Sequence, residues 1–137
     1  CYIEPQTNAY IDVANVEKVN NVHWYRDPEN LNDIRANSSV FISTSEDEPF
    51  GLSILESMVA GLAIVIPSDN AYWDQHLTDG HDCVKYDPNS VDSLVQVLTL
   101  LINNPAFLFK IAQQAKHSAQ QYCHVRCYSH ILNCIPN

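Results

Sequence analysis

The stretch Glu48-Pro49-Phe50-Gly51-Leu52-Ser53-Ile54-Leu55-Glu56 decides the fold, because it joins a loop to the start of a helix between two apolar segments. Before it, Val40 to Ser43 is typical of a short buried strand, and Ala63 to Ile66 predicts a second strand after it. The helix is expected from about Phe50 to Ala60, where Gly61 ends it. Strand, loop, helix and strand at this spacing predict a βαβ unit of a parallel sheet.

The start of this helix suits an anionic ligand. The first amides of a helix have no partner inside it, and the helix dipole favours negative charge there. Gly51 has no side chain, so a ligand can approach the backbone closely. We therefore expect the amides near Phe50 to Leu52 to hold a phosphate or a sugar oxygen.

Glu56 is expected on the half of the helix that faces away from the core. At 100° per residue, Ser53 and Ser57 share this half. The opposite half is expected to hold Leu52, Ile54, Leu55, Met58 and Val59. Glu56 lies roughly 7.5 Å along the axis from Gly51, about the reach from a pyrophosphate to a ribose, and its carboxylate could accept hydrogen bonds from both ribose hydroxyls. The spacing alone also fits an ordinary helix with a solvated glutamate.

The motif resembles that of a known family. In their order and spacing, Ser45, Glu48, Phe50, Gly51, Leu52, Glu56, Met58 and Gly61 resemble the E-x(7)-E signature of retaining glycosyltransferases with the GT-B fold. Asp79-Gly80 and Asp87-Pro88 are similar to the "DG" and "DP" turns of that family, and Leu94 to Asn104 followed by Pro105 is similar to its penultimate helix and the break after it. The resemblance covers about residues 20 to 122.

The resemblance implies roles for individual residues. Glu48 would contact hydroxyls of the donor sugar, and it is our candidate catalytic residue. Phe50, Gly51, Leu52 and Glu56 would bind the nucleotide-diphosphate sugar donor. Tyr25 and Arg26 lie at the end of a predicted strand, where the family often reads the base through backbone groups, although a surface cation is the better interpretation of Arg26. No cofactor, metal or enzyme nucleophile is expected, since catalysis in this family rests on positioning and charge stabilisation.

The chain departs from the family pattern after the second predicted strand. Ser68-Asp69 is similar to the family's turn, but Ala71-Tyr72 replaces the usual glycine pair and Gln75 replaces an acid. These departures leave open the sugar specificity and an altered or lost activity. Trp73 could stack on a ligand, although packing is the better interpretation.

Composition limits the functional classes. The net charge of −9, with seven Lys and Arg, argues against nucleic-acid binding and repels a diphosphate at long range. No apolar run is long enough to cross a membrane, and no signal peptide is visible. The odd number of cysteines, five, fits reduced thiols in a cytoplasmic protein.

The charge also bears on domain organisation. In the resembled family, an Arg and a Lys early in this domain neutralise the diphosphate, and no counterpart is identified after Cys1. We therefore expect residues 1–137 to be a single nucleotide-sugar-binding domain, a fragment whose partner is the missing N-terminal acceptor domain. The full-length protein could associate peripherally with a membrane.

The rest of the chain alternates strand and helix. Further strands are expected at Cys1 to Ile3, Val22 to Tyr25 and Cys83 to Tyr86, and further helices at 9–19, 28–37, 72–77, 90–103, 105–122 and 124–132. Five short strands between helices predict a doubly wound parallel α/β sheet, the Rossmann-like half of a GT-B fold. In such sheets ligands bind beyond the carboxyl ends of the strands, so the loops after Tyr25, Ser43 and Pro67 would share the binding edge.

Two questions stay open in the sequence. The stripe Cys123, Cys127, His130 and Cys134 extends over roughly 16 Å of helix, too far for one tetrahedral zinc, so packing against the missing domain is our hypothesis. A GT-B sugar-nucleotide epimerase or a non-catalytic α/β interaction module remains an alternative to a transferase that acts on a glycan or lipid-linked acceptor.

Overall fold

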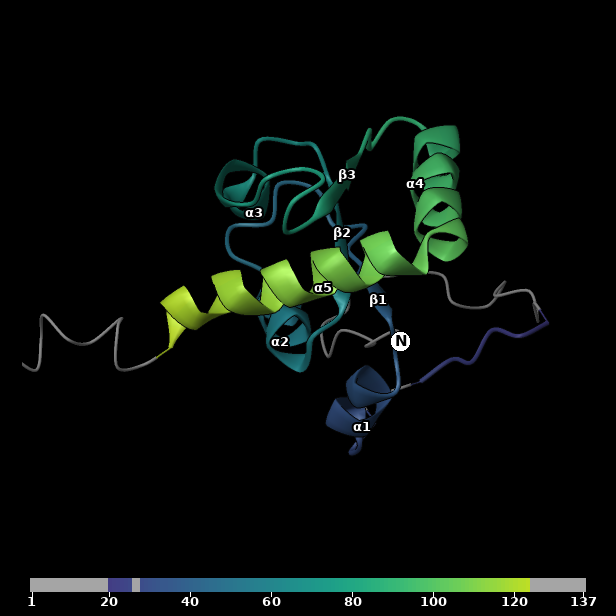
Figure 1. Ribbon diagram of the computed structural model, residues 1–137, viewed down its shortest axis with the longest axis vertical. Coiled ribbons are helices and arrows are strands. Elements are labelled where there is room, and N and C mark those ends of the chain that lie inside the picture. Colours follow the sequence, from purple (N-terminus) through teal and green to yellow (C-terminus); the bar gives the residue numbers. More distant parts are fainter. Residues whose placement is uncertain (1–19, 26–27, 124–137) are drawn as a thin grey trace, which may run out of the picture. The chain divides into compact units, whose positions relative to one another are not determined.

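The computed structural model describes residues 20–25 and 28–123. Residues 1–31 and 32–137 form two compact units, and the sheet lies in the second. The elements are α1 (Leu31–Ala36), β1 (Val40–Ile42), α2 (Leu52–Ala60), β2 (Ala63–Pro67), α3 (Tyr72–His76), β3 (Val84–Tyr86), α4 (Val91–Asn103), α5 (Pro105–Ala119) and the 3-10 turn η2 (Gln120–Tyr122), as Figure 1 shows. The α/β class predicted from the sequence is confirmed.

The sheet is parallel, with the strand order β1-β2-β3. Val40 pairs with Ala63 in the first ladder, and Val65 pairs with Val84 in the second. All five residues of the central strand β2 are buried, because helices cover both faces of the sheet. The βαβ unit predicted around the glutamate motif is therefore formed.

The sheet separates two hydrophobic clusters. Alternate side chains of β2 point to opposite faces, so Ile64 and Ile66 belong to one cluster while Ala63 and Val65 belong to the other. Helices α2 and α3 cover the first face, and α4 covers the second. Helix α5 contributes to both, with Ile111 and Ala112 in the second cluster and Ala115 and Ala119 in the first. Figure 1 shows α5 extending from the side of α4 to the side of α2.

The helix ends follow the sequence signals. Gly61 ends α2 with a φ of 87°, a left-handed conformation that costs glycine little. The Ser90 side chain accepts a hydrogen bond from the Ser93 N–H at the start of α4, and Asn104 caps α5 in the same way through the Phe107 N–H. Pro105 occupies the first turn of α5, where a missing N–H does no harm.

One prediction about the strands needs correction. Residues 22–25 do not form a strand in the described structure, because a strand needs a neighbour for its N–H and C=O groups and none of the three strands pairs with this segment. Three of the five predicted strands are formed, at Val40–Ile42, Ala63–Pro67 and Val84–Tyr86. The segments predicted at Cys1 to Ile3, 9–19 and 124–132 lie outside the described residues.

The face of α2 also differs from the prediction. Ser57, expected to face outward, is fully buried, whereas Leu52 and Val59 are 64% and 56% exposed. Burial of Ser57 costs little because its hydroxyl donates to the Ser53 carbonyl at 2.7 Å. Helix α2 is covered by both β2 and α5, so more of its surface is buried than one apolar face.

None of the described helices is by itself long and apolar enough to span a membrane. Only α4 and α5 taken together reach the required length and composition, and a bend of 103° separates them.

Candidate functional site

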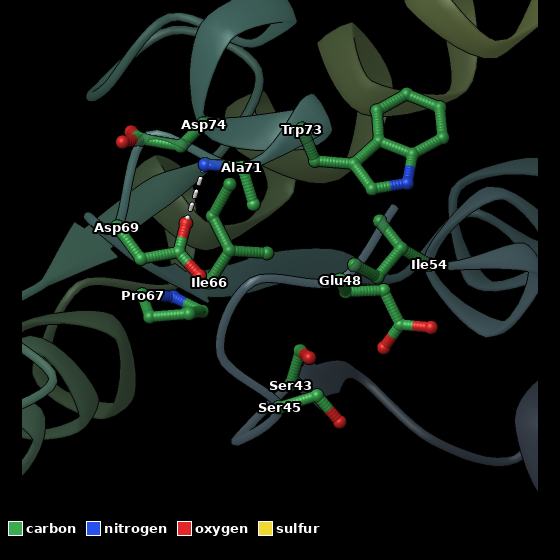
Figure 2. A pocket seen from close by; sticks show the side chains of 10 residues that line it. All are labelled: Ser43, Ser45, Glu48, Ile54, Ile66, Pro67, Asp69, Ala71, Trp73 and Asp74. Carbon is green, nitrogen blue, oxygen red and sulfur yellow. Dashed lines mark hydrogen bonds between the residues drawn. The ribbon is translucent and has the colours of Figure 1, made fainter. Parts of the chain in front are cut away.

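A pocket lies at the carboxyl ends of β1 and β2 (Figure 2). Its empty volume of about 220 Å³ includes the open solvent at its mouth, so it is a shallow hollow in the surface and does not enclose a ligand. It is lined by Ser43, Ser45, Glu48, Ile54, Ile66, Pro67, Asp69, Ala71, Trp73 and Asp74. Two of the three loops that were predicted to share a binding edge, after Ser43 and after Pro67, meet here.

Glu48 is the one pocket carboxylate that no described residue engages. It is partly buried, and among the described residues its carboxylate makes no hydrogen bond or ion pair. Its side chain lies against Gly51, since a Cβ built on that glycine would be 3.1 Å from Glu48 Cγ. The sequence-predicted catalytic residue therefore lines the pocket and can offer its oxygens to the hydroxyls of a ligand.

The other two pocket carboxylates have structural partners. Asp69 Oδ2 accepts the Asp47 N–H at 2.9 Å, and its Oδ1 accepts the Ala71 N–H at 2.9 Å. One side chain thus joins the loop that carries Glu48 to the loop after β2. This clamp fixes the Glu48 loop at a point where Asp47 has a φ of 54°.

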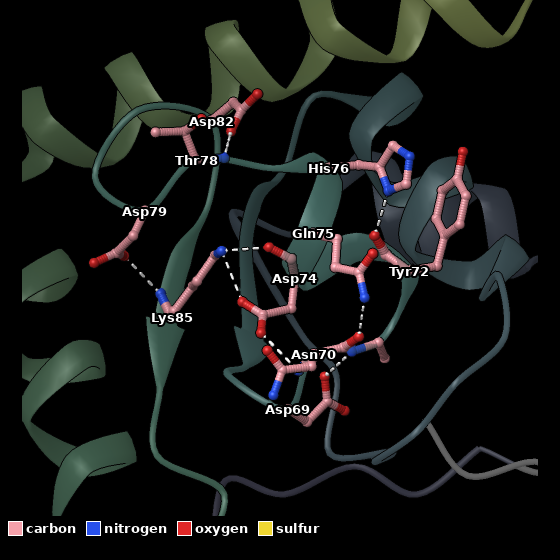
Figure 3. Close-up of polar contacts among 11 residues, drawn as sticks. Asp69, Asn70, Tyr72, Asp74, Gln75, His76, Thr78, Asp79, Asp82 and Lys85 are labelled. Atoms are coloured by element: carbon pink, nitrogen blue, oxygen red, sulfur yellow. Dashed lines mark hydrogen bonds and ion pairs between the residues drawn. The ribbon is translucent and has the colours of Figure 1, made fainter.

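Asp74 belongs to an ion pair behind the pocket (Figure 3). Lys85 Nζ lies 2.7 Å from Asp74 Oδ1, and the Asn70 N–H donates to Asp74 Oδ2 at 2.8 Å. Burial alone would raise the pKa of Asp74, but Lys85 and the Asn70 N–H outweigh it and lower the pKa below its ordinary value of 3.8. Asp74 is therefore ionised, and its two oxygens are already bound by Lys85 and by the Asn70 N–H.

The N-terminus of α2 faces the same region. Gly51 is its N-cap residue, with a φ of 67°, and none of the described side chains caps the first amides. The Gly51 carbonyl accepts the indole N–H of Trp73 at 3.3 Å. Amides without a side-chain cap can bind an anion, as the sequence predicts for Phe50 to Leu52.

A cluster of aromatic side chains packs against Phe50, next to the start of α2. Trp73 is 2% exposed, and its ring centroid is 5.3 Å from that of Phe50. Tyr72 and Tyr122 complete the cluster, with their hydroxyls 3.1 Å apart. Packing, not ligand stacking, is thus confirmed for Trp73, and the side chain of Phe50 anchors the loop whose backbone was predicted to bind.

Glu56 lies on the exposed side of α2, as predicted, and outside the lining of the pocket. Its side chain is 51% exposed and its Oε2 forms an ion pair with Arg35 Nη2 of α1. The two glutamates of the motif therefore occupy different positions, with Glu48 in the pocket and Glu56 farther along the helix.

Two further predictions cannot be placed against this site. Tyr25 is described, but it belongs to the other compact unit. Arg26 lies outside the described residues, as do Cys127, His130 and Cys134. The binding roles of Glu48, Phe50, Gly51, Leu52, Glu56, Tyr25 and Arg26 stay predictions.

The described cysteines and tyrosines near the sheet offer no nucleophile. Burial raises the pKa of the Cys83 thiol to about 12, so it is protonated at neutral pH. Burial also raises the pKa of Tyr86, and the charges of Glu46 and Asp69 add to this effect. Its hydroxyl donates to the Ser43 carbonyl at 3.0 Å, which ties β3 to the end of β1.

Sequence reasoning missed Lys85, Asp74 and Arg35. Lys85 is a lone cation in an apolar strand, and such a residue signals a buried partner. Arg35 gave no signal, because its partner Glu56 is 21 residues away in the chain.

Comparisons with known proteins identify a family that matches the sequence and solved structures that match the fold. A family model described as "Glycosyl transferases group 1" matches residues 6–121. No curated protein sequence matches the chain.

Solved structures resemble the fold. The Anabaena protein HepE, in complex with UDP and glucose, has a TM-score of 0.73 at 20% identity, over 83% of this chain and 31% of that chain. The C-terminal domain of the group 1 family glycosyl transferase LpcC from Francisella tularensis gives 0.63 at 22% identity, over 73% and 51%. Sucrose-phosphate synthase from Thermosynechococcus elongatus gives 0.64 at 15% identity, over 73% and 25%. At these identities the likeness shows the fold, and the chain spans between about a quarter and a half of these structures.

Proposed function

The chain belongs to the family of group 1 glycosyl transferases, with a GT-B type, Rossmann-like fold, and from that membership we propose that it is the donor-binding domain of a retaining glycosyltransferase. The donor would be a nucleotide-diphosphate sugar; the Anabaena relative has been solved in complex with UDP-glucose. The acceptor, a glycan or a lipid-linked molecule, would be held by a separate N-terminal domain. The chain spans between about a quarter and a half of the three solved structures named above.

One observation carries the proposal: Glu48 is a partly buried carboxylate that no described residue engages, and it lines a pocket beside the N-terminus of α2, whose first amides no described side chain caps. A ligand that fits both features needs hydroxyl donors for the carboxylate and an anionic group for the amides. A sugar joined to a diphosphate has both. The sugar ring would lie over the mouth of the hollow, with its hydroxyls toward Glu48, and the diphosphate would lie at the helix start.

The same arrangement suits transfer without an enzyme nucleophile. In this proposal the acceptor oxygen bonds to the anomeric carbon on the face from which the diphosphate oxygen leaves, and the acceptor proton passes to the leaving diphosphate. The domain would contribute position and charge stabilisation. Glu48 would hold the sugar, and the amides of Phe50 to Leu52 would stabilise the charge that develops on the diphosphate.

The proposal is tested by calorimetric titration of the chain with UDP-glucose and with the corresponding ADP and GDP sugars. We expect binding of at least one of them, and Glu48→Gln should weaken it by about tenfold, because the carboxylate makes charge-assisted hydrogen bonds to the sugar. Glu46→Gln is the matched control, since it removes the same charge from the same loop at an exposed position that does not line the pocket.

Two results would contradict the proposal. If none of the nucleotide sugars binds, the domain is a non-catalytic module that has kept the fold. If Glu48→Gln and Glu46→Gln weaken binding equally, only the overall charge matters and Glu48 does not hold the sugar.

A further inference from the structure

The ion pair between Arg35 and Glu56 joins two helices that are distant in the sequence. Arg35 Nη2 contacts Glu56 Oε2, and Arg35 Nη1 donates a hydrogen bond to Asn32 Oδ1 at 3.2 Å. The Arg35 side chain is 13% exposed, whereas that of Glu56 is 51% exposed. The guanidinium is thus fixed by two partners and mostly covered, and the carboxylate that it touches remains open to solvent.

This asymmetry argues against a purely stabilising role. An ion pair in which one partner is half exposed contributes little to stability, because water screens it. Its main physical effect is on orientation, since a glutamate has three rotatable side-chain bonds and a contact to a fixed cation restricts them.

The Glu56 carboxylate keeps most of its capacity to accept hydrogen bonds. A carboxylate has two oxygens and about four acceptor positions, and the contact with Arg35 uses one of these on Oε2. The remaining positions are enough for two hydroxyl donors on neighbouring carbons. The exposed fraction of Glu56 shows that the side facing solvent is accessible to them.

We propose that Arg35 is a positioning residue that orients the Glu56 carboxylate for a vicinal diol, the 2′- and 3′-hydroxyls of the donor ribose. This inference rests on the proposed function and adds to it a residue of α1. A carboxylate ordered in advance binds more tightly than one that must be ordered by the ligand.

The test measures the ratio of two affinities, that for a nucleoside diphosphate and that for the same diphosphate without its 2′- and 3′-hydroxyls. UDP, ADP, GDP and CDP are titrated in turn, and the one that binds is compared with its 2′,3′-dideoxy form. The unchanged chain should prefer the ribose form by about tenfold or more. Arg35→Gln should reduce this preference to about threefold, and Arg35→Lys should retain part of it because the charge is kept.

Two further variants separate positioning from other effects. Glu56→Gln should reduce the preference as well, and adding Arg35→Gln to it should change the preference no further, because both act through one carboxylate. Lys110→Gln removes a positive charge at an exposed position of α5, and it should leave the preference unchanged. Thermal unfolding of each variant measures any loss of fold.

The outcomes distinguish the two proposals. If Arg35→Gln weakens the ribose and dideoxy forms equally, or weakens neither, Arg35 does not position Glu56 and this inference is wrong, while the proposed function stands. If the unchanged chain binds none of the diphosphates, the proposed function fails and the inference fails with it.

Discussion

The indole N–H of Trp73 donates a hydrogen bond to the carbonyl of Gly51 at 3.3 Å, and this contact joins α3 to the first turn of α2. The same carbonyl accepts the N–H of Ile54 at 3.0 Å. The residue that starts the helix is therefore held both by the helix and by a buried side chain from the next element. Because Glu48 lies against Gly51, this contact also fixes one wall of the pocket.

Trp73→Phe should lower the free energy of unfolding by about 1–3 kcal/mol, because it removes this hydrogen bond and leaves a cavity in the aromatic cluster. Urea denaturation monitored by circular dichroism measures the change. Trp24→Phe is the control, since Trp24 is 56% exposed and its replacement should change stability by less than about 0.5 kcal/mol. Equal losses in both variants would contradict a structural role for the Trp73 contact.

Gly51→Ala should destabilise the protein by more than Gly80→Ala, although the two glycines have nearly equal φ angles of 67° and 68°. The left-handed conformation costs an alanine about 1–2 kcal/mol at either position. At Gly51 the added Cβ would also lie 3.1 Å from Glu48 Cγ and from Ile54 Cδ1, whereas at Gly80 it would meet nothing within 4 Å.

Thermal unfolding of both glycine variants measures this difference, and donor titration completes the comparison. We expect Gly51→Ala alone to weaken donor binding, because it displaces Glu48. Equal stability and equal binding in the two variants would show that the space beside Gly51 is unimportant.

Lys85→Met should lower the free energy of unfolding at pH 7 by about 2–4 kcal/mol, because it leaves Asp74 buried and without its cation. The pKa of Asp74 is lowered in the folded protein, so the pair stabilises the fold above the ordinary pKa of 3.8 and loses this effect as pH falls through the lower folded value.

The stability difference between the unchanged chain and Lys85→Met should therefore be constant above about pH 5 and shrink below about pH 4. Denaturation at a series of pH values from 7 to 3 measures it. Lys110→Met, at an exposed position of α5, should show no such difference. If the stability difference stays constant down to pH 3, the stabilisation does not depend on the ionised carboxylate of Asp74.

Asp69→Ala should lower stability by about 1–2 kcal/mol, because the N–H groups of Asp47 and Ala71 lose their acceptor. It should also weaken donor binding about threefold or more, since the loop that carries Glu48 is no longer fixed. Asp87→Ala removes a comparable turn contact, the Asn89 N–H to Asp87 Oδ1, at a position outside the pocket. Calorimetry should find that Asp69→Ala reduces donor affinity and that Asp87→Ala does not. Similar affinities in the two variants would show that Asp69 does not fix the loop that carries Glu48.

The local signals in the sequence predicted most of the framework. Gly61, Ser90 and Pro105 act on the backbone of their own turn, so the ends of three helices could be located without knowledge of the fold. The alternation of apolar segments with the glutamate motif likewise placed β1, α2 and β2, because periodicity reflects which face is buried.

The errors concern properties that depend on distant neighbours. Residues 22–25 have the composition of a strand, but a strand exists only where another backbone pairs with it. Ser57 is buried although it is polar, because α2 is covered by both β2 and α5, and helical periodicity does not report how many elements pack on a helix.

The candidate site was predicted in outline and not in detail. Glu48 and Gly51 follow from the spacing of one motif, and the structure brings them into contact. The pairs Asp74–Lys85 and Arg35–Glu56 join residues 11 and 21 positions apart, and only the folded arrangement of α1, α2, α3 and β3 brings their charges together.

Helix α5 has side chains in both hydrophobic clusters, so the two layers of the domain share one element. Detachment of α5 would expose apolar surface on both sides of the sheet at once. Opening one layer alone is therefore unfavourable, and amide hydrogen exchange in the middle of α2 and in the middle of α4 should proceed through the same global unfolding event.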